Sequence, residues 1–346
     1  MNADIFLWLV QDGVTNGALY ALLALALMLV FAVTRVIFVP QGEFITYAAL
    51  SLSLLEAGRT PGTIYILALG GLAAAAIDGL AALRERAWRR LPRIVALYIV
   101  LPLAVALLVA WAAPHRFGHW VEVLLVLAMV VPLGPIVYRV AYQPLAGASV
   151  LVLFIVSMAV HYVLTGLSLV FFGGEGLRSS PFWDARFRLG VVEVSAQSLF
   201  VVAASLVLIV ALWLLFEHTI YGKALRATAI NRVGARLVGI PTALTGQLSF
   251  LLAAFIGAVT GILVSSITTL YYDTGFLIGL KGFVGAILGG MASYPLAAVG
   301  ALVLGLLESF ASFWASPFKE VIVFTSIIPM LVWLSLRSRH VEEDEE

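Results

Sequence analysis

Long apolar stretches separated by short polar segments run through the whole sequence. A helix crosses a hydrocarbon core about 30 Å thick with roughly 20 apolar residues, and most of these stretches approach that length. The 346-residue chain is 62% hydrophobic and only 11% charged, so a water-soluble fold cannot cover its apolar side chains. The sequence therefore predicts an all-α, polytopic transmembrane bundle of about 9–11 segments in one domain, residues 1–346. The stretches lie at about 14–34, 43–57, 63–83, 94–113, 121–138, 150–172, 196–217, 246–268, 277–292, 296–314 and 320–336.

Proline and glycine residues lie at two of the boundaries between apolar segments. These residues free backbone N–H and C=O groups that hydrocarbon cannot satisfy but a protein-lined cavity can. Pro40-Gln41-Gly42 and Ser293-Tyr294-Pro295 therefore predict broken or re-entrant helices. A helix N-terminus at such a break carries unpaired N–H groups and partial positive charge, which suits the carboxylate of an amino acid.

The distribution of Lys and Arg predicts the orientation in the membrane. When residues 84–93, which contain five arginines, are placed in the cytoplasm, alternation assigns a side to every other loop. Thirteen Lys and Arg residues then lie in cytoplasmic segments and six in exterior ones. This predicts an exterior N-terminus, a cytoplasmic C-terminus and an exterior 173–195 loop. The acidic tail, residues 340–346, is expected to be a solvated end.

The composition and the spacing of polar residues exclude several function classes. The absence of cysteine excludes disulfides and thiolate metal sites, and a net charge of +1 argues against a nucleic-acid partner. Gly222-Lys223 is followed by Ala224, which rules out a Walker A loop and hence ATP hydrolysis by this chain. His115 and His119 are four residues apart but lack a third metal ligand, so we expect no metal site.

A small-residue stripe marks the segments around 277–305. Small residues on one face let helix backbones approach closely, so we expect Gly282, Gly285, Gly289 and Gly290 to serve helix packing. Direct contact with a substrate is the alternative for this stripe.

Four of the charged residues within the apolar segments are singled out: Glu43, Asp78, Lys281 and Glu308. Each is costly there unless it is paired or hydrated, so each is a functional candidate. Asp78 and Glu308 lie near predicted helix ends, where their side chains can reach the interface. The set is too sparse for a proton relay. His161, near Thr165 in a predicted helix, is expected to be a hydrogen-bonded packing residue.

The loop at 218–245 is the largest segment predicted to be cytoplasmic. Its apolar residues Leu225, Ile230, Val233 and Leu237 recur at roughly helical spacing with arginines between them, which predicts a short amphipathic helix. It either docks on a partner protein or lies at lipid headgroups.

Three parts of the chain carry residues in an order typical of one transporter family. The first runs from Gly17–Leu22 through Arg35–Ile37 to Gly42–Phe44, the second covers Tyr221–Ala227 and Ala235–Ile240, and the third covers Gly279–Gly290 with Ser293, Pro295 and Gly305–Glu308. Tyr142–Leu145 adds a weaker match. In these parts the chain resembles the permease subunit of branched-chain amino acid ATP-binding-cassette importers, specifically the first permease of the high-affinity leucine/isoleucine/valine type.

The resemblance implies a function, a location and a set of partners. It implies a non-enzymatic subunit, without a cofactor, that imports branched-chain amino acids or related amides and acids across a bacterial inner membrane. The implied partners are two cytoplasmic ATPase subunits, a second identical or homologous permease, an extracytoplasmic substrate-binding protein and membrane lipid. Loop 218–245 would couple to the ATPases, and two of the matching parts would line or shape the translocation path. The coupling residues are Lys223, Arg226, Arg232, Gly234, Ala235, Arg236 and Gly239, and the path residues are Gln41, Gly42, Glu43 and Lys281.

The chain also departs from the family pattern. Phe38–Gly42 stands where the family shows Asn-Phe-Ala-His-Gly, so Gln41 replaces the histidine. Val233-Gly234-Ala235 lacks the Glu of the family's Glu-Ala-Ala motif. Residues 84–138 predict an additional helical hairpin. A secondary transporter or channel working without ATP is the main alternative function, and composition also leaves a membrane scaffold open.

Overall fold

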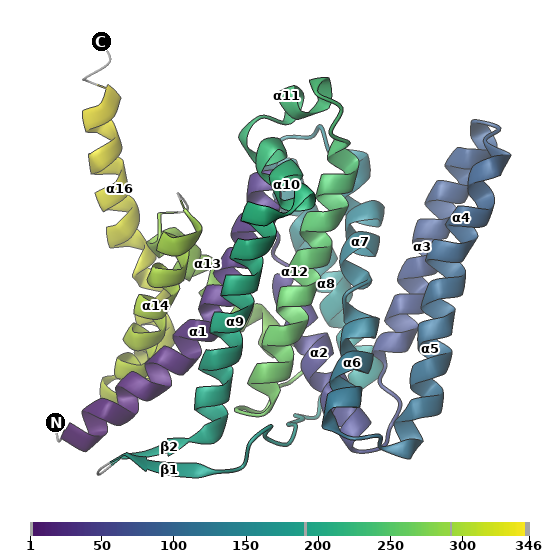
Figure 1. Ribbon diagram of the computed structural model, residues 1–346. Coiled ribbons are helices and arrows are strands. Elements are labelled where there is room, and N and C mark those ends of the chain that lie inside the picture. Colours follow the sequence, from purple (N-terminus) through teal and green to yellow (C-terminus); the bar gives the residue numbers. More distant parts are fainter. Residues whose placement is uncertain (1–2, 190–191, 291–292, 343–346) are drawn as a thin grey trace. The chain divides into compact units, whose positions relative to one another are not determined.

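The computed structural model describes residues 3–189, 192–290 and 293–342, and these residues are almost entirely helical (Figure 1). Nine helices within them are long and apolar enough to cross a membrane. The prediction of an all-α, polytopic bundle is therefore confirmed. The nine are Asp4–Thr34, Thr63–Arg84, Trp88–His115, His119–Leu145, Val150–Phe172, Ala196–His218, Thr242–Ser265, Tyr294–Trp314 and Ser316–Trp333.

The chain divides into two compact units, which we call unit 1 and unit 2. Unit 1 contains Met1–Met28, Phe182–Trp213 and Leu277–Glu346, and unit 2 contains Leu29–Pro181 and Leu214–Phe276. Three helices pass from one unit into the other: α1 (Ala3–Thr34), α9 (Ala196–His218) and α13 (Thr274–Leu288).

Unit 2 is built around helix α2, which is buried along nearly its whole length. Gly257 and Gly261 of α12 bring that helix against Gln41, Phe44 and Ile45 of α2. Polar residues of α2 such as Thr46 and Ser51 are fully buried, which an ordinary lipid-facing helix does not allow. The helices of the unit are α2 (Gln41–Glu56), α3 (Thr63–Arg84), α4 (Leu91–Val95), α5 (Leu101–Ala112), α6 (His119–Val130), α7 (Leu133–Val137), α8 (Val150–Phe172), α10 (Ile220–Ile230), α11 (Arg232–Leu237) and α12 (Thr242–Ser265).

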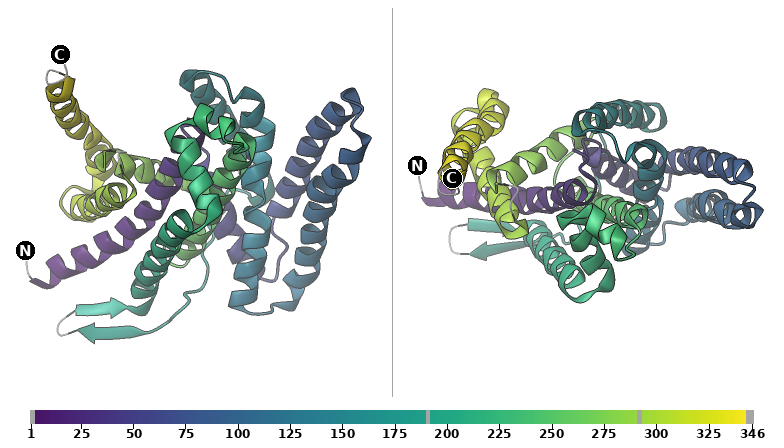
Figure 2. Two further views of the ribbon diagram at one scale, coloured as in Figure 1. Left: turned by 45° about the horizontal axis from the view of Figure 1, so that its top comes forward. Right: turned by 90° about the horizontal axis from the view of Figure 1, so that it is seen from above.

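The stretch 84–138 contributes a helical hairpin to unit 2. A π-helical turn at Ala96–Val100 joins α4 to α5, and the chain reverses at Arg116 and Gly118, which both have positive φ. Figure 2 shows α3 running beside the helix formed by α4 and α5. Gly71 of α3 lies against the Tyr98 carbonyl and Pro102, which accounts for the close approach.

Small residues let the helices of unit 1 pack closely against one another. Gly13 and Gly17 of α1 lie against Gly305 and its neighbours on α14 (Tyr294–Trp314). Tyr20, Ala24, Val284 and Leu304 belong to the hydrophobic core of this unit. The remaining helices are α15 (Lys319–Thr325) and α16 (Ile327–Glu342), and residues 343–346 of the expected acidic tail lie outside the described residues.

The predicted exterior loop 173–195 contains a β-hairpin that the apolar pattern did not indicate. Strands β1 (Arg186–Leu189) and β2 (Val192–Ser195) pair antiparallel, with Phe187 opposite Val194. Gln197 Oε1 accepts a hydrogen bond from the Phe182 backbone N–H at 2.9 Å, which ties the loop to the start of α9.

Both predicted helix breaks occur. Helix α1 ends at Thr34 and α2 begins at Gln41, with Arg35 in the left-handed region at φ +62°. Helix α13 ends at Leu288, and the Ser293 hydroxyl caps α14 by accepting from the Leu296 N–H at 3.4 Å.

The α2–α12 contact predicts an asymmetry between two glycines. A Cβ on Gly261 would meet the backbone of Ile45, whereas one on Gly166 of α8 would meet no atom within 4 Å. We expect Gly261→Ala to destabilise unit 2 by about 1–3 kcal/mol through overpacking. Gly166→Ala should leave stability unchanged or raise it, because alanine favours helix by about 1 kcal/mol over glycine. Thermal melting in detergent measures both, and equal melting temperatures would contradict the packing argument.

Candidate functional site

A buried polar cluster lies at the start of α2, which we call the Glu43 site. Gln41 and Glu43 in the first turn of α2 are fully buried. Glu43 Oε1 is 2.9 Å from His161 Nδ1 and accepts from Thr165 Oγ1 at 3.1 Å. His161 and Thr165 are four residues apart on α8, so they face α2 together. Gln41 Nε2 donates to the Ala253 carbonyl of α12 at 3.0 Å.

The Glu43 site offers hydrogen-bond acceptors. Among the described residues, Gln41 Oε1 and Glu43 Oε2 are buried without a hydrogen-bond partner. A buried unsatisfied group costs about 1–3 kcal/mol, so a donor or a proton at these atoms is strongly favoured. The Glu43 carboxylate already complements the positive end of α2. This helix N-terminus therefore suits a cation or a donor better than the substrate carboxylate that its sequence suggested.

Gly42 and Gly275 bring α2 and the start of α13 into backbone contact. A Cβ on either glycine would meet the carbonyl of the other. The Gly275 N–H also donates to Thr46 Oγ1 at 3.1 Å. Gly42 thus shapes unit 2 by close packing and has no side chain to present to a path.

Lys281 lies in an ion-pair network within unit 1. Its Nζ is 2.5 Å from Glu308 Oε1 and 3.0 Å from Glu320 Oε1. The Tyr20 hydroxyl donates to the other Glu308 oxygen at 2.5 Å, and Lys319 Nζ is 4.0 Å from Glu308. Two cations balance two carboxylates in this Lys281 network. Lys281 and Glu308 are buried, whereas the side chains of Lys319 and Glu320 are 37% and 39% exposed. Glu308 therefore lies in the protein interior and does not reach the interface.

A second charge of the apolar segments, the partly buried Asp78, is paired in unit 2. Arg139 donates to the Asp78 carboxylate, and Nε of Arg139 is 2.6 Å from Asp78 Oδ1. A pocket of about 420 Å³ opens beside this pair, lined also by Arg90, Arg93 and Tyr98. The pocket is mainly polar, and its lining pairs Arg139 with Asp78 and Arg90 with Glu85.

The loop 218–245, which we call the coupling segment, folds as two short capped helices in unit 2. The Thr219 hydroxyl caps α10 at the Gly222 N–H (3.0 Å), and the Asn231 side chain caps α11 at the Gly234 N–H (2.8 Å). Gly239 ends α11 with φ +87°. Leu225 and Ala235 are buried, which holds both helices on the unit.

The outer face of the coupling segment is apolar. Ile230 is 85% exposed and Leu237 is 84% exposed, with Val233 and Val238 also exposed. Two of the predicted coupling arginines bond to the protein itself: the half-buried Arg232 donates to the Ala146 carbonyl at 3.0 Å, and the exposed Arg236 donates to Thr242 Oγ1 at 2.9 Å. Arg226 forms an exposed pair with Glu217 at 2.7 Å. The arginines hold the segment while apolar side chains form its outer surface.

Comparison with known proteins identifies the family. Residues 94–334 match the family described as branched-chain amino acid transport system / permease component. The chain belongs to this permease family. It is therefore a multi-pass membrane protein, as its nine apolar helices independently indicate.

Named relatives agree with this assignment. The high-affinity branched-chain amino acid transport system permease protein LivH of Escherichia coli (strain K12) is 28% identical over 205 residues, which is 56% of this chain and 65% of that protein. BraD of Pseudomonas aeruginosa, with the corresponding name, is 27% identical over 207 residues, 58% of this chain and 67% of BraD. A probable LivH of Methanocaldococcus jannaschii is 29% identical over 213 residues, 58% of this chain and 66% of that protein.

The permease family match covers most of the parts that carried the resemblance. Its range of 94–334 includes the coupling segment and Gly279–Gly290, and it begins after the Gly17–Phe44 part. The range also includes most of the 84–138 hairpin.

The structure locates the predicted packing glycines. Gly282 lies against Leu23, Gly285 against Ala301 and Gly289 against Ala297, all within unit 1. Gly290 instead follows the end of α13 with φ +73°.

Sequence reasoning missed the partners of the membrane charges in this permease. His161 is 118 residues from Glu43, and Arg139 is 61 residues from Asp78. Glu320, the first residue of the apolar stretch 320–336, also pairs with Lys281. The available signal for His161 was its spacing from Thr165, which places both side chains on one helix face.

The Lys281 network predicts strong coupling between two residues. Lys281→Met leaves the buried Glu308 carboxylate without its nearest cation, so we expect a loss of about 3–5 kcal/mol. Adding Glu308→Gln removes the uncompensated charge and should recover much of that loss. The check is thermal melting of both single variants and the double variant in detergent. Additive effects of the two substitutions would contradict the pairing, and Lys319→Met is the control with a small expected effect.

Proposed function

We propose that this chain is the membrane-spanning permease subunit of an ATP-binding-cassette importer for branched-chain amino acids or related small amides and acids. The observation that carries this proposal is the permease-family match over residues 94–334. The relatives bear the name of a branched-chain amino acid transport system. The proposed location is a bacterial inner membrane, and no catalytic residue or cofactor is assigned to the chain.

The proposed partners are two cytoplasmic ATPase subunits, a second permease and an extracytoplasmic binding protein. The exposed apolar face of the coupling segment supports ATPase docking, since Ile230 and Leu237 are almost fully exposed on short, well-capped helices. A compact segment of this kind transmits ATPase closure as a rigid-body movement. Membrane lipid is a further proposed partner, and Arg93, which lines the pocket beside Asp78, supports contact with an anionic headgroup.

We further propose that the Glu43 site contributes to the translocation path. Its unpaired acceptor oxygens suit the ammonium group of an amino acid. Gly42 contributes by close packing, and Lys281 shapes unit 1 through its ion pairs. Alternating access then requires that ATP and substrate favour different states of the transporter.

The contacts within unit 2 support the proposed division of the loops between the two sides of the membrane. Segments assigned to the exterior touch one another: Arg116 donates to the Ala57 carbonyl at 3.0 Å, and the Ser180 N–H donates to Glu56 at 2.9 Å. Segments assigned to the cytoplasm also touch one another: Arg232 of the coupling segment donates to the carbonyl of Ala146, which lies in the loop that follows Arg139. Residues assigned to one side therefore gather together.

Substrate uptake into proteoliposomes tests the proposed function. The permease is reconstituted with its candidate ATPases and binding protein, and labelled leucine uptake is measured with and without ATP. We expect Leu237→Asp to reduce ATP-dependent uptake at least about tenfold, because a charge in a desolvated interface costs more than 1.4 kcal/mol. Leu237→Met keeps the apolar surface and serves as the matched control.

The same assay separates the two transport classes. Because Leu237 is 84% exposed, neither variant should affect folding, which size-exclusion profiles in detergent verify. Uptake driven by an ion gradient without ATPase subunits would contradict the importer proposal and favour a secondary transporter.

The proposed orientation predicts opposite labelling of two single cysteines. The natural chain has no cysteine, so each engineered thiol reports without background. Arg59→Cys should react with a membrane-impermeant maleimide added to intact cells. Arg84→Cys should react only after the membrane is permeabilised. The reverse pattern would invert the proposed topology.

A further inference from the structure

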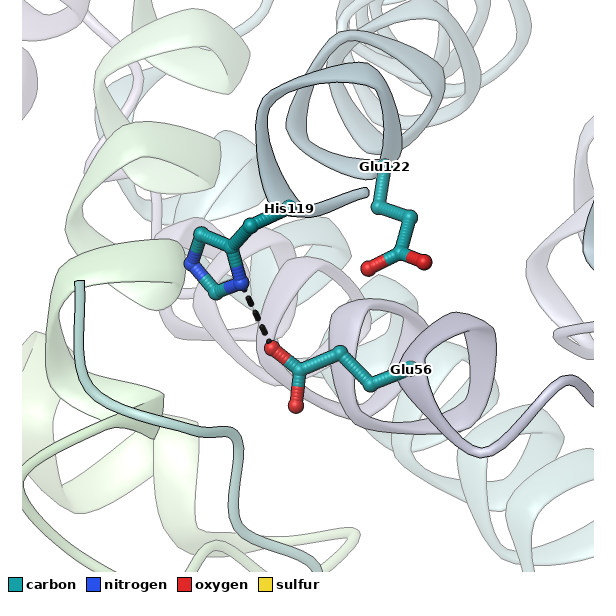
Figure 3. Close-up of side chains that lie close together, drawn as sticks. All are labelled: Glu56, His119 and Glu122. Carbon is teal, nitrogen blue, oxygen red and sulfur yellow. Dashed lines mark ion pairs between the residues drawn. The ribbon is translucent and has the colours of Figure 1, made fainter. Parts of the chain in front are cut away.

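Three potential metal ligands converge at one end of unit 2. Glu56 is the last residue of α2, and His119 and Glu122 lie three residues apart in the first turn of α6 (Figure 3). One ligand atom from each of the three lies within 4.8 Å of the others. His119 Nδ1 is 2.9 Å from Glu56 Oε1, a separation compatible with two ligands each about 2.0–2.2 Å from a shared ion.

The burial and direction of the Glu122 side chain point to a bound ligand. Its side chain is only 6% exposed, and it has no hydrogen bond or ion pair within the part of the chain that the structure describes. Figure 3 shows its carboxylate directed towards His119 and Glu56. The Arg116 guanidinium, in the preceding turn, donates its hydrogen bond to the Ala57 carbonyl. Its interaction with Glu122 is therefore electrostatic, without a hydrogen bond. Glu56 and Glu122 repel each other at this distance, and a cation held between the two carboxylates would relieve that repulsion.

Neighbouring contacts hold the other carboxylate in place. Glu56 accepts hydrogen bonds from both the N–H and the hydroxyl of Ser180, each at 2.9 Å. Such outer contacts orient a ligating carboxylate before the metal arrives. His115 takes no part, because its Nδ1 is 2.7 Å from the Trp111 carbonyl oxygen and its ring stacks on Phe117. The histidine pair that the sequence suggested is therefore not the set that the fold assembles.

We propose that Glu56, His119 and Glu122 bind a divalent transition-metal ion. One imidazole nitrogen and two carboxylate oxygens form a mixed donor set that suits Zn²⁺ or Mn²⁺, with a further position left for water. The two positive charges of the ion balance the two carboxylates. The ion cross-links the end of α2 to the start of α6. This inference rests on the geometry of unit 2 and is independent of the proposed transport function.

The test is metal binding by the purified full chain in detergent. The protein is stripped with a chelator and dialysed against Zn²⁺, and bound metal is measured by mass spectrometry. We expect one Zn²⁺ per chain and a metal-dependent rise in melting temperature. Co²⁺ should give the visible absorption bands of a site with one nitrogen and two oxygen ligands from the protein.

Two variants make the result decisive. Glu122→Gln preserves the shape of the side chain and should weaken Zn²⁺ binding at least about tenfold. His115→Ala, only four residues from His119, should leave binding unchanged. Size-exclusion profiles establish that each variant remains folded. The proposal is overturned if Glu122→Gln binds as tightly as the natural chain, if His115→Ala abolishes binding, or if stoichiometric Zn²⁺ is absent.

Discussion

The close contact between α2 and α12 is the constraint on which unit 2 depends. Gly257 and Gly261 let the two backbones approach, and a side chain at Gly261 would collide with Ile45. In hydrocarbon there is no hydrophobic drive between helices, so such contacts and buried hydrogen bonds hold them together. The contact surrounds α2 with protein and removes it from lipid. Only a helix in that position can carry Gln41 and Glu43 fully buried in its first turn.

Burial of α2 determines how the polar groups of this permease are satisfied. Because hydrocarbon offers no hydrogen bonds, a buried charge needs a protein partner, and the structure supplies one from another helix for Glu43, Asp78 and Lys281. Glu43 has His161 and Thr165, Asp78 has Arg139, and Lys281 has Glu308 and Glu320. The Glu43–His161 and Asp78–Arg139 pairs join helices that are not consecutive in the sequence, so they help to specify which helices are neighbours in unit 2.

The sequence predicted the elements of this fold better than their partners. Apolar runs of membrane-spanning length predicted the long helices, and Pro40 and Pro295 marked the breaks, because hydrophobicity and helix interruption are local properties. The pairing of Glu43 with His161 joins residues 118 positions apart and depends on packing, which no local pattern records. The coupling segment shows the same limit. Its helical spacing was visible, but the alternation of apolar and basic residues did not show that Arg232 bonds to the Ala146 carbonyl of a distant loop.

Helix α2 carries residues of both the Glu43 site and the proposed metal site of unit 2. Glu43 and Glu56 lie at opposite ends of the same helix, about 20 Å apart at 1.5 Å per residue. Because the glycine contacts hold α2 tightly against α12, it can tilt or shift only as a rigid body. Movement of its start at the Glu43 site must therefore also displace Glu56 relative to His119 and Glu122. An ion held by those three ligands would resist that displacement, so its occupancy and the position of α2 are thermodynamically linked.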